Sequence, residues 1–372
     1  KKIRMGKIYT ALGLMSGTSM DGVDASIIQT NGKSQYKAIL DTYFEYSKSI
    51  YSNLTTLIDN IKNSKDLKKH QKKIQLVEKE ITIFHAEIVK EILKKSKLNI
   101  DFIGFHGQTI FHNAEEKISR QIGDGKLLSK LTKKKVVYNF RKNDLFNGGE
   151  GAPLAPVFHK LLVEQNNIKT PLTILNIGGI ANITSIRNKS WTNKFALSGS
   201  EDIGPGNCLI DRWIRLNSDK KYDEKGLIAR SGTVDKFILN QSLDSFYNSA
   251  ISKKKSYDTN DFDLSFIKGL SLENGAATLT EYTADICSKK LINRNIYVSG
   301  GGRKNTFLIQ RIKKKIHCKI RLIDHIGING DFIESQAFAY LAIRSFLKLP
   351  ISFPNTTGCK KPCTCGVLVK NY

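Results

Sequence analysis

The sequence contains no long hydrophobic run. None of its apolar stretches approaches the ~18 uninterrupted residues of a membrane-spanning helix, so we expect no transmembrane segment and no membrane partner. Residues 1–5 are basic and lead into a predicted strand, without the apolar core and small-residue cleavage site of a secretory signal. We therefore expect a cytoplasmic protein.

Acidic residues are also scarce. Asp and Glu number 34 against 59 Lys and Arg, which gives a formal net charge of +25. Such a charge is typical of nucleic-acid-binding proteins. The lysine runs at 133–135, 253–255 and 313–315 lack interleaved aromatic residues, however, and lysine is spread along the chain together with much Asn and Ile. We interpret the charge as compositional drift on solvated surfaces and expect no nucleic-acid partner, with nucleic-acid binding as the alternative.

Cysteine is limited to six residues, of which three lie together near the C-terminus, at Cys359, Cys363 and Cys365. A closed zinc site usually needs four ligands, and no His or fourth Cys lies nearby in the sequence. We interpret these thiols as reduced and structurally incidental, as in most cytosolic enzymes. A metal site or a disulfide is the alternative.

The length and the order of predicted elements indicate two α/β domains. Strands are expected at 8–14, 24–30, 36–46, 172–178 and 181–187, and helices at 70–96, 207–217, 273–290 and 331–347. Strand, Gly-rich turn and strand occur twice, which suggests an internal repeat of architecture. Residues 215–260 hold few apolar residues. We predict one lobe of residues 1–138 plus 345–372 and a second lobe of residues 139–344, around a ligand cleft.

The segment GLMSGTSMDGVD, residues 13–24, predicts a turn that could hold phosphate. Gly17 and Gly22 permit a tight turn, and the hydroxyls and backbone N–H groups between them suit anionic oxygens. Asp21 and Asp24 could hold a hydrated cation beside the phosphates. The Walker A pattern is absent. An ordinary Ser/Thr/Gly hairpin turn is the alternative.

Two further glycine turns follow predicted strands, in NIGGIANIT (176–184) and in VSGGGRKN (298–305). Consecutive glycines let a flat ligand or a phosphate chain approach the backbone closely. Each turn alone could be an ordinary strand end. Three such turns in one chain favour a nucleotide ligand.

Two polar segments are candidates for the reaction itself. DIGPGN, residues 202–207, is predicted to be a loop that holds Asp202 at a strand end, where a carboxylate can take a proton from water or a hydroxyl. Capping of the following helix is the alternative. GFHGQT, residues 104–109, places His106, Gln108 and Thr109 after a short strand that is expected to end at His106, which could instead be a structural histidine.

These segments together resemble the anhydro-N-acetylmuramic acid kinase family. The matching pieces are GLMSGTSMDGVD, GFHGQT, QIGD (121–124), NFRKND with GGEGAPL (139–154), LNIGGIANIT, DIGPGNCLIDRW, VSGGGRKN, ESQAFAYLA (334–342) and the tail TTGCKKPCTCG. They extend from residue 12 to beyond the last helix, and their combination is specific although no single piece is.

The resemblance implies an actin/hexokinase-like, ribonuclease H-like α/β fold with two lobes and a central nucleotide and sugar cleft. It also implies a cytoplasmic role in recycling cell-wall sugar. The implied enzyme uses ATP, Mg²⁺ and water to open the anhydro bridge and phosphorylate the 6-hydroxyl of anhydro-N-acetylmuramic acid. A kinase of another small sugar on the same fold is the alternative, and a homodimer is a candidate assembly.

The resemblance also assigns roles to residues. It implies that Asp202 is the catalytic base and that Asp21 is a candidate Mg²⁺ ligand. We expect sugar contacts from His106, Gln108, Thr109 and Glu334. The residues expected at ATP are Gly17, Thr18, Ser19, Met20, Asp21, Gly22, Val23, Asp24, Gly178, Gly179, Gly300, Gly301, Gly302 and Asn305.

One assignment and three departures from the family pattern need separate mention. Glu334 follows Asp331 at a capping-box spacing, so a helix cap is its alternative role. Asn139 stands where relatives have Asp, and Ile203 where a small or polar residue is usual. The tail cysteines replace residues expected to be Ala, Thr or Val.

Overall fold

The computed structural model describes residues 6–188, 195–254, 256–292 and 295–370. The basic residues 1–5 and Lys255 of the second lysine run lie outside these ranges. The chain divides into two compact units, of which the first comprises Lys1–Ile168 and Phe332–Tyr372 and the second Lys169–Asp331. None of the described helices has the length and apolar character that crossing a membrane requires.

The first unit is built on a seven-stranded sheet in the order β12-β6-β4-β1-β2-β3, with β5 paired to β4 outside this row. Its strands are β1 (Tyr9–Ser16), β2 (Gly22–Thr30), β3 (Tyr36–Glu45), β4 (Phe102–Asn113), β5 (Ile118–Ile122), β6 (Lys135–Tyr138) and β12 (Val367–Val369). Strands β1 to β3 are antiparallel neighbours, whereas β4 runs parallel to both β1 and β6.

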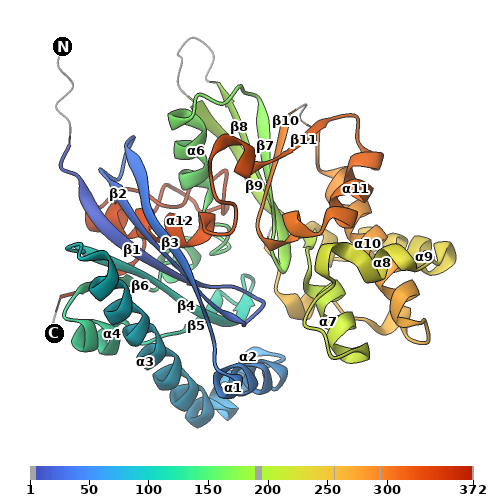
Figure 1. Ribbon diagram of the computed structural model, residues 1–372, viewed down its shortest axis with the longest axis horizontal. Coiled ribbons are helices and arrows are strands. Elements are labelled where there is room, and N and C mark those ends of the chain that lie inside the picture. Colours follow the sequence, from blue (N-terminus) through green and yellow to red (C-terminus); the bar gives the residue numbers. More distant parts are fainter. Residues whose placement is uncertain (1–5, 189–194, 255, 293–294, 371–372) are drawn as a thin grey trace. The chain divides into compact units, whose positions relative to one another are not determined.

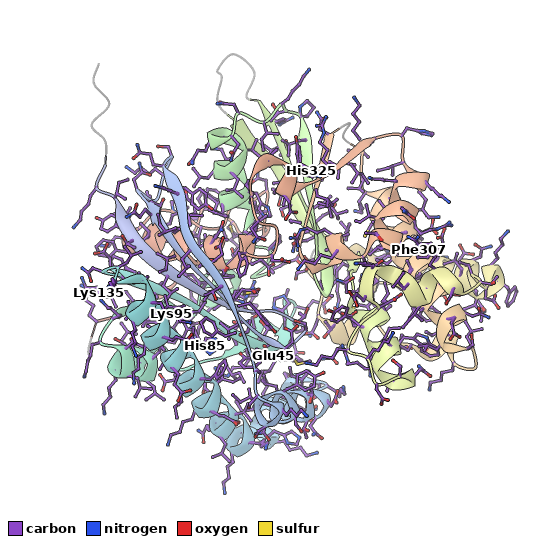
Figure 2. All side chains as sticks on the ribbon, viewed as in Figure 1. Glu45, His85, Lys95, Lys135, Phe307 and His325 are labelled. Carbon is purple, nitrogen blue, oxygen red and sulfur yellow. The ribbon has the colours of Figure 1, made fainter. Side chains whose placement is uncertain are left out.

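The helices of the first unit lie on both faces of this sheet (Figure 1). They are α1 (Lys48–Asp59), α2 (Ser64–Lys69), α3 (Gln71–Ser96), α4 (Gly125–Thr132), α5 (Lys142–Phe146), α6 (Pro156–Gln165) and α12 (Ile333–Phe346). Leu12 and Leu14 of β1 share a buried cluster with residues of α1 and α3. His85 of α3 lies in the same layer, with its ring centroid 4.9 Å from that of Phe105 (Figure 2).

Helix α12 packs closely on the opposite face because two strands carry glycine there. Residues alternate between faces along a strand, so Gly13 points away from Leu12 and Leu14. A Cβ at Gly13 would overlap the Ser335 carbonyl oxygen, and one at Gly104 would overlap that of Phe338. The two glycines therefore allow the backbone of α12 to lie directly on β1 and β4.

The second unit is built on a five-stranded sheet in the order β11-β10-β7-β8-β9. Its strands are β7 (Leu172–Ile177), β8 (Ile180–Asn188), β9 (Phe195–Pro205), β10 (Asn295–Ser299) and β11 (Lys319–Leu322). Its helices are α7 (Cys208–Asn217), α8 (Leu227–Ser231), α9 (Lys236–Asn248), α10 (Leu272–Lys289) and α11 (Thr306–Lys315).

The two sheets share one plan. In each, three consecutive strands form an antiparallel meander, and two later strands lie parallel to the first strand of that meander. This duplicated order is that of the actin/hexokinase-like, ribonuclease H-like class. The α/β fold class and the internal repeat expected from the sequence are confirmed, and the nucleotide and sugar cleft stays a prediction.

The two units divide at different places from the lobes expected at 138/139 and 344/345. Helix α6 packs on α12, and α12 packs on β1, β2 and β4. Gln165 at the end of α6 also binds β3, because its Nε2 donates to the Tyr36 carbonyl at 2.6 Å and its Oε1 accepts the Tyr36 N–H at 3.0 Å. Residues 139–168 and all of α12 thus belong to the first unit.

Two local expectations also differ from the structure. The strand predicted to end at His106 is β4, which continues to Asn113 because it pairs with β5. The predicted loop DIGPGN is mostly strand, since β9 extends to Pro205. The segment 215–260 contains α8 and α9, and Leu239 and Phe246 of α9 are buried in the core of the second unit.

Candidate active site

The turn between β1 and β2 is the predicted phosphate turn. The Met20 N–H donates to the Gly17 carbonyl at 3.2 Å, and Met20 adopts a left-handed φ of 58°. The Ser19 hydroxyl donates to Asp21 Oδ1 at 2.6 Å, and the Tyr46 N–H donates to the Asp21 carbonyl at 2.8 Å. The turn is therefore held in one conformation while the side chains of Thr18 and Ser19 remain exposed.

Val23 and Asp24 lie beyond this turn, inside β2. The Val23 side chain is fully buried in the core, so it can contact a ligand only through its backbone. Asp24 is half-buried and pairs with Tyr43 of β3. Asp21 is thus the carboxylate of the turn itself, and one carboxylate suits Mg²⁺, which keeps several water and phosphate ligands.

The GFHGQT segment joins the phosphate turn because β4 lies beside β1. Ser16 pairs with Gln108, whose Nε2 donates to the Gly17 carbonyl at 3.1 Å and to the Thr109 carbonyl at 3.3 Å. The Gln108 side chain is 1% exposed, and its Oε1 has no hydrogen-bond partner. A buried amide oxygen left unpaired costs free energy, so a donor from a ligand would suit this position.

His106 is buried with both ring nitrogens engaged. Its Nδ1 lies 2.7 Å from the Gly107 carbonyl oxygen, to which it can donate, and its Nε2 lies 2.8 Å from an N–H₂ group of Arg141. Burial, and then the Arg141 charge, lowers the pKa of His106 to about 3, so the imidazole is neutral. Arg141 also donates to the Gly151 carbonyl at 2.9 Å. These contacts favour the structural reading of His106.

Asn139 and Asp144 belong to the same region. Asn139 adopts a left-handed φ of 58°, which Asn tolerates better than most residues, so this departure from the family pattern is sterically accommodated. Asp144 is fully buried, and its Oδ2 accepts the Gly151 N–H at 2.7 Å.

Glu334 lies in the first turn of α12, and neighbouring residues fix that turn to the sheet. The Ser335 hydroxyl lies 2.7 Å from that of Ser26, and Gln336 Nε2 donates to both Asp41 carboxylate oxygens at 2.9 Å. The N-terminal cap of α12 is Phe332, with no side-chain capping bond. The helix begins after Asp331, so Asp331 does not occupy the N-cap position that the capping-box spacing predicted for it.

Two predicted segments of the second unit pack directly on each other. The Gly206 and Cys208 N–H groups donate to the Gly179 carbonyl at 2.9 and 3.1 Å, and the Asn207 N–H donates to the Gly178 carbonyl at 2.8 Å. A Cβ at Gly206 would overlap the Gly178 carbonyl oxygen. The β7–β8 turn and the start of α7 thus form one rigid backbone unit.

The turn of three glycines after β10 is held by Arg303. This guanidinium donates to Asp324 at 2.7 and 2.9 Å, to Asp331 at 2.6 Å and to the Gly300 carbonyl at 3.2 Å. Its hydrogen bonds and charge hold the pKa of Asp324 below its ordinary value, and at Asp331 they do so against burial and together with Lys304. Asn305 Oδ1 accepts the Leu308 N–H at 3.0 Å and caps α11, and the contact of Asn305 with ATP stays a prediction.

Asp202 is placed by a bulge in β9. Asn182 of β8 pairs with Asp202 and Ala181 pairs with Gly204, which leaves Ile203 as the extra residue. Such bulges re-aim neighbouring side chains. Ile203 is 3% exposed and packs into the core, whereas Asp202 Oδ2 accepts the Tyr257 N–H at 2.9 Å. Asp202 lies in the strand, so it does not cap α7, for which no side-chain cap is present.

Apart from Gly179, the glycines predicted at ATP fall into two groups. At Gly22, Gly300 and Gly302 an added Cβ would meet backbone or core atoms, so the fold itself requires glycine there. At Gly17 the nearest atom to an added Cβ is Ser19 Oγ at 4.0 Å, and at Gly301 nothing lies within 4 Å. Gly178 has ordinary clearance as well, at 3.5 Å. Space that a Cβ would fill at these three positions suits a ligand close to the backbone.

The family comparison covers both units. The family model described as anhydro-N-acetylmuramic acid kinase matches residues 9–371. The chain belongs to this family. An anhydro-N-acetylmuramic acid kinase from Pelagibacter ubique (strain HTCC1062) is 56% identical, with 99% of this chain and 100% of that protein covered. One from Zymomonas mobilis is 38% identical, with 96% and 98% covered.

A distant structural likeness accompanies this match. The solved structure of component A of the (R)-2-hydroxyglutaryl-CoA dehydratase of Acidaminococcus fermentans is similar to this chain, with a TM-score of 0.45 and 11% sequence identity. The alignment covers 91% of this chain and 100% of component A.

Sequence reasoning missed two residues that build the site. Tyr257 holds Asp202 through its backbone N–H, and a backbone contact cannot be recognised from the residue type. Tyr257 also lies 55 positions from Asp202 in the sequence. Arg303 stands inside VSGGGRKN, and the acidic residues Asp324 and Asp331 further along the chain were the available signal for its role.

Proposed function

We propose that the chain uses ATP and water to open the anhydro bridge of anhydro-N-acetylmuramic acid and to phosphorylate its 6-hydroxyl. The products are N-acetylmuramic acid 6-phosphate and ADP. The observation that carries this proposal is the family match over residues 9–371, which includes every predicted motif. The alternative, a kinase of another small sugar, rests on the fold alone.

Asp202 is proposed as the general base. Its carboxylate takes a proton from water as that water attacks the anomeric carbon, and the bridge oxygen leaves as the 6-oxygen, which attacks the γ-phosphate of ATP. The bond from the Tyr257 N–H and the bulge at Ile203 support this role because they fix the carboxylate in direction. A positioned base contributes roughly 10²–10⁴-fold in rate.

The phosphates of ATP are proposed to lie against the turn of residues 17–21, with Gly178 and Gly301 close to the nucleotide. Support comes from the open space beside Gly17, Gly178 and Gly301. The packing of the fold would accept a side chain at these positions, so it does not explain why glycine stands there. Asp21 would hold Mg²⁺, which neutralises phosphate charge when bound.

The sugar is proposed to contact Gln108, Thr109 and Glu334. Gln108 Oε1 is buried without a partner, and the contacts of Ser335 and Gln336 fix the turn that carries Glu334. His106 is better explained as the residue that positions Arg141, since both of its nitrogens are engaged.

We assign the reaction to the cytoplasm, in the recycling of cell-wall sugar, with a homodimer as the candidate assembly. The six free cysteines suit a reducing compartment. The nucleic-acid alternative has less support, because Lys315 of one lysine run forms ion pairs with Glu281 and Asp285.

A coupled assay for ADP release, with and without the anhydro sugar, tests the proposal. ADP should form only when the anhydro sugar is present, and ordinary hexoses or glycerol should not replace it. Asp202→Asn should lose about 10²–10⁴-fold in kcat. Glu201→Gln on the same strand is the matched control, because Glu201 pairs with Lys290 at the surface and should not affect the rate. Release of ADP with hexoses alone would favour the alternative kinase.

A further inference from the structure

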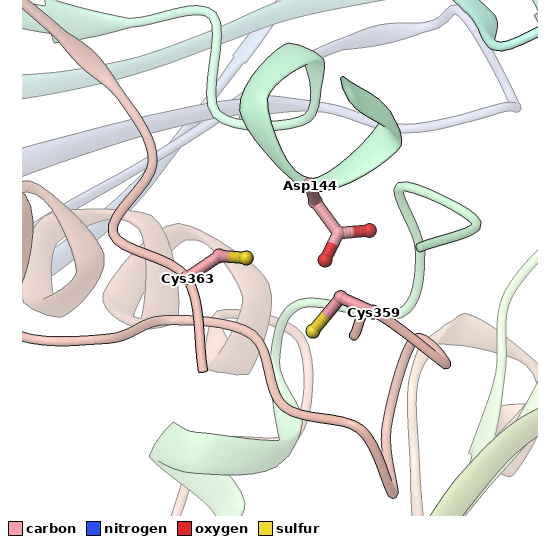
Figure 3. Close-up of side chains that lie close together, drawn as sticks. All are labelled: Asp144, Cys359 and Cys363. Atoms are coloured by element: carbon pink, nitrogen blue, oxygen red, sulfur yellow. The ribbon is translucent and has the colours of Figure 1, made fainter. Parts of the chain in front are cut away.

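The C-terminal tail brings two thiols to a buried carboxylate. One ligand atom each of Asp144, Cys359 and Cys363 lies within 4.8 Å of the others. The three side chains are 0%, 1% and 4% exposed, and Figure 3 shows them turned toward one another. Asp144 comes from α5, whereas both cysteines come from the tail, so the cluster joins segments more than 200 residues apart.

The printed hydrogen bonds to the carboxylate in this cluster come from neutral donors. Asp144 accepts hydrogen bonds from the Gly151 N–H at 2.7 Å and the Thr357 hydroxyl at 2.6 Å. In the part of the chain that the structure describes, no Lys, Arg or His forms an ion pair with it. A buried carboxylate without a countercharge is costly, and a bound cation is the usual remedy besides an ion pair.

We propose that Asp144, Cys359 and Cys363 bind one borderline-soft divalent cation of the Zn²⁺ class. Thiolate sulfur selects such ions over Mg²⁺ or Ca²⁺. Zn–S bonds of about 2.3 Å place tetrahedral sulfur ligands about 3.8 Å apart, so atoms within 4.8 Å need only small shifts. Binding converts each coordinating thiol to a thiolate and releases its proton.

Cys365 is the candidate fourth ligand. It is 3% exposed, and its Sγ lies 3.9 Å from Ser352 Oγ, which in turn lies 3.9 Å from Cys359 Sγ. A tetrahedral site needs this fourth donor or a water. The spacing of the cysteines in the sequence did not indicate this metal site, because Asp144 is remote in sequence.

A disulfide between Cys359 and Cys363 explains the cluster less well. It would consume an external two-electron oxidant and would leave the Asp144 carboxylate without a cation. A metal ion instead ties the tail to α5 and to Gly151, whose carbonyl accepts from Arg141 at 2.9 Å. The ion is therefore a structural clamp of the first unit, separate from the proposed chemistry.

Metal binding to the full chain tests the proposal. The chain is stripped with a chelator and titrated with Zn²⁺ alone or Co²⁺ alone, and bound metal is measured by elemental analysis. We expect one equivalent per chain, with thiolate-to-cobalt charge-transfer absorption. Cys359→Ser/Cys363→Ser should lose this equivalent, and the single Cys363→Ser should bind at least about 100-fold more weakly.

Cys287→Ser is the matched control, because Cys287 is a buried free thiol of the second unit. It should keep the equivalent. The proposal fails if the native chain binds no metal, if the double variant retains it, or if mass spectrometry of the chain before chelation finds Cys359 and Cys363 joined as a disulfide. Circular dichroism establishes that each variant is folded, and the native titration stands by itself should the double variant not fold.

Discussion

Three buried histidines should make the first unit sensitive to mild acid. His85 on α3, His106 on β4 and His159 on α6 are each at most 5% exposed. Burial lowers the pKa of His85 to about 4, that of His106 to about 3 and that of His159 to about 4. All three are therefore neutral in the folded protein at pH 5, whereas in the unfolded chain they are mostly protonated.

The unfolded chain thus binds more protons between pH 6.5 and pH 4, and the free energy of unfolding falls as the pH falls through this window. With an unfolded pKa of 6.5, each histidine costs about 1.8 kcal/mol between pH 7 and pH 5. The three together cost about 5 kcal/mol, comparable to the whole stability of many domains. The result depends little on the folded pKa values, because all of them lie below 5.

Urea denaturation at pH 7 and pH 5 measures this effect. His85→Phe should reduce the loss of stability between the two pH values by about 1.8 kcal/mol, because the ring remains packed against Phe105 but no longer titrates. Phe105→Leu, which alters the packing beside the same ring without adding or removing a titratable group, is the control and should change the stability equally at both pH values. Equal pH dependence of His85→Phe and the native chain would refute the reasoning.

Further predictions concern the turns and the charge. Gly17→Ala should keep the native melting temperature yet weaken ATP binding by about tenfold or more, equal to ~1.4 kcal/mol. Gly22→Ala should instead lower the melting temperature, because its Cβ would meet β3. If calorimetry gave Gly17→Ala the same ATP affinity as the native chain, the phosphate turn would be contradicted. Arg303→Gln should destabilise the chain at pH 7 by about 1–3 kcal/mol. Since Arg303 holds the pKa of Asp324 and Asp331 low, this difference should shrink as the pH falls below about 4; a constant difference in urea titrations would count against it. Although the net charge is +25, the lysines are spread along the chain, so binding to duplex DNA should be weak, with Kd on the order of 10⁻⁴–10⁻⁶ M at physiological salt. A nanomolar, salt-resistant complex would contradict this expectation.

The fold was predictable where local patterns repeat. The apolar spacing of residues 70–96 predicted α3, and two strand–turn–strand segments predicted the duplicated meander. The boundary of the units was not predictable, because α12 belongs to the first unit through close packing of Ser335 on Gly13, a contact between residues 322 positions apart in the sequence. Only tertiary structure shows that these residues meet.

The candidate site was also predictable from local sequence patterns and not where it depends on tertiary contacts. Motifs identified the turns and Asp202, since glycine and acidic residues are visible as residue types. The bulge at Ile203 and the Tyr257 N–H that orient Asp202 are backbone features, which the sequence does not record. The glycines could not be sorted from sequence either, because only packing distinguishes Gly17 from Gly22.

The central claim is that water attacks the sugar carbon while phosphate is transferred from ATP. It is tested most directly by running the reaction in water enriched in heavy oxygen and locating the label by mass spectrometry, before ring-opening exchange scrambles it. We predict that the label lies at the anomeric oxygen of the product and that the transferred phosphate is unlabelled. Label found only in phosphate would mean simple hydrolysis of ATP and would contradict the proposed function.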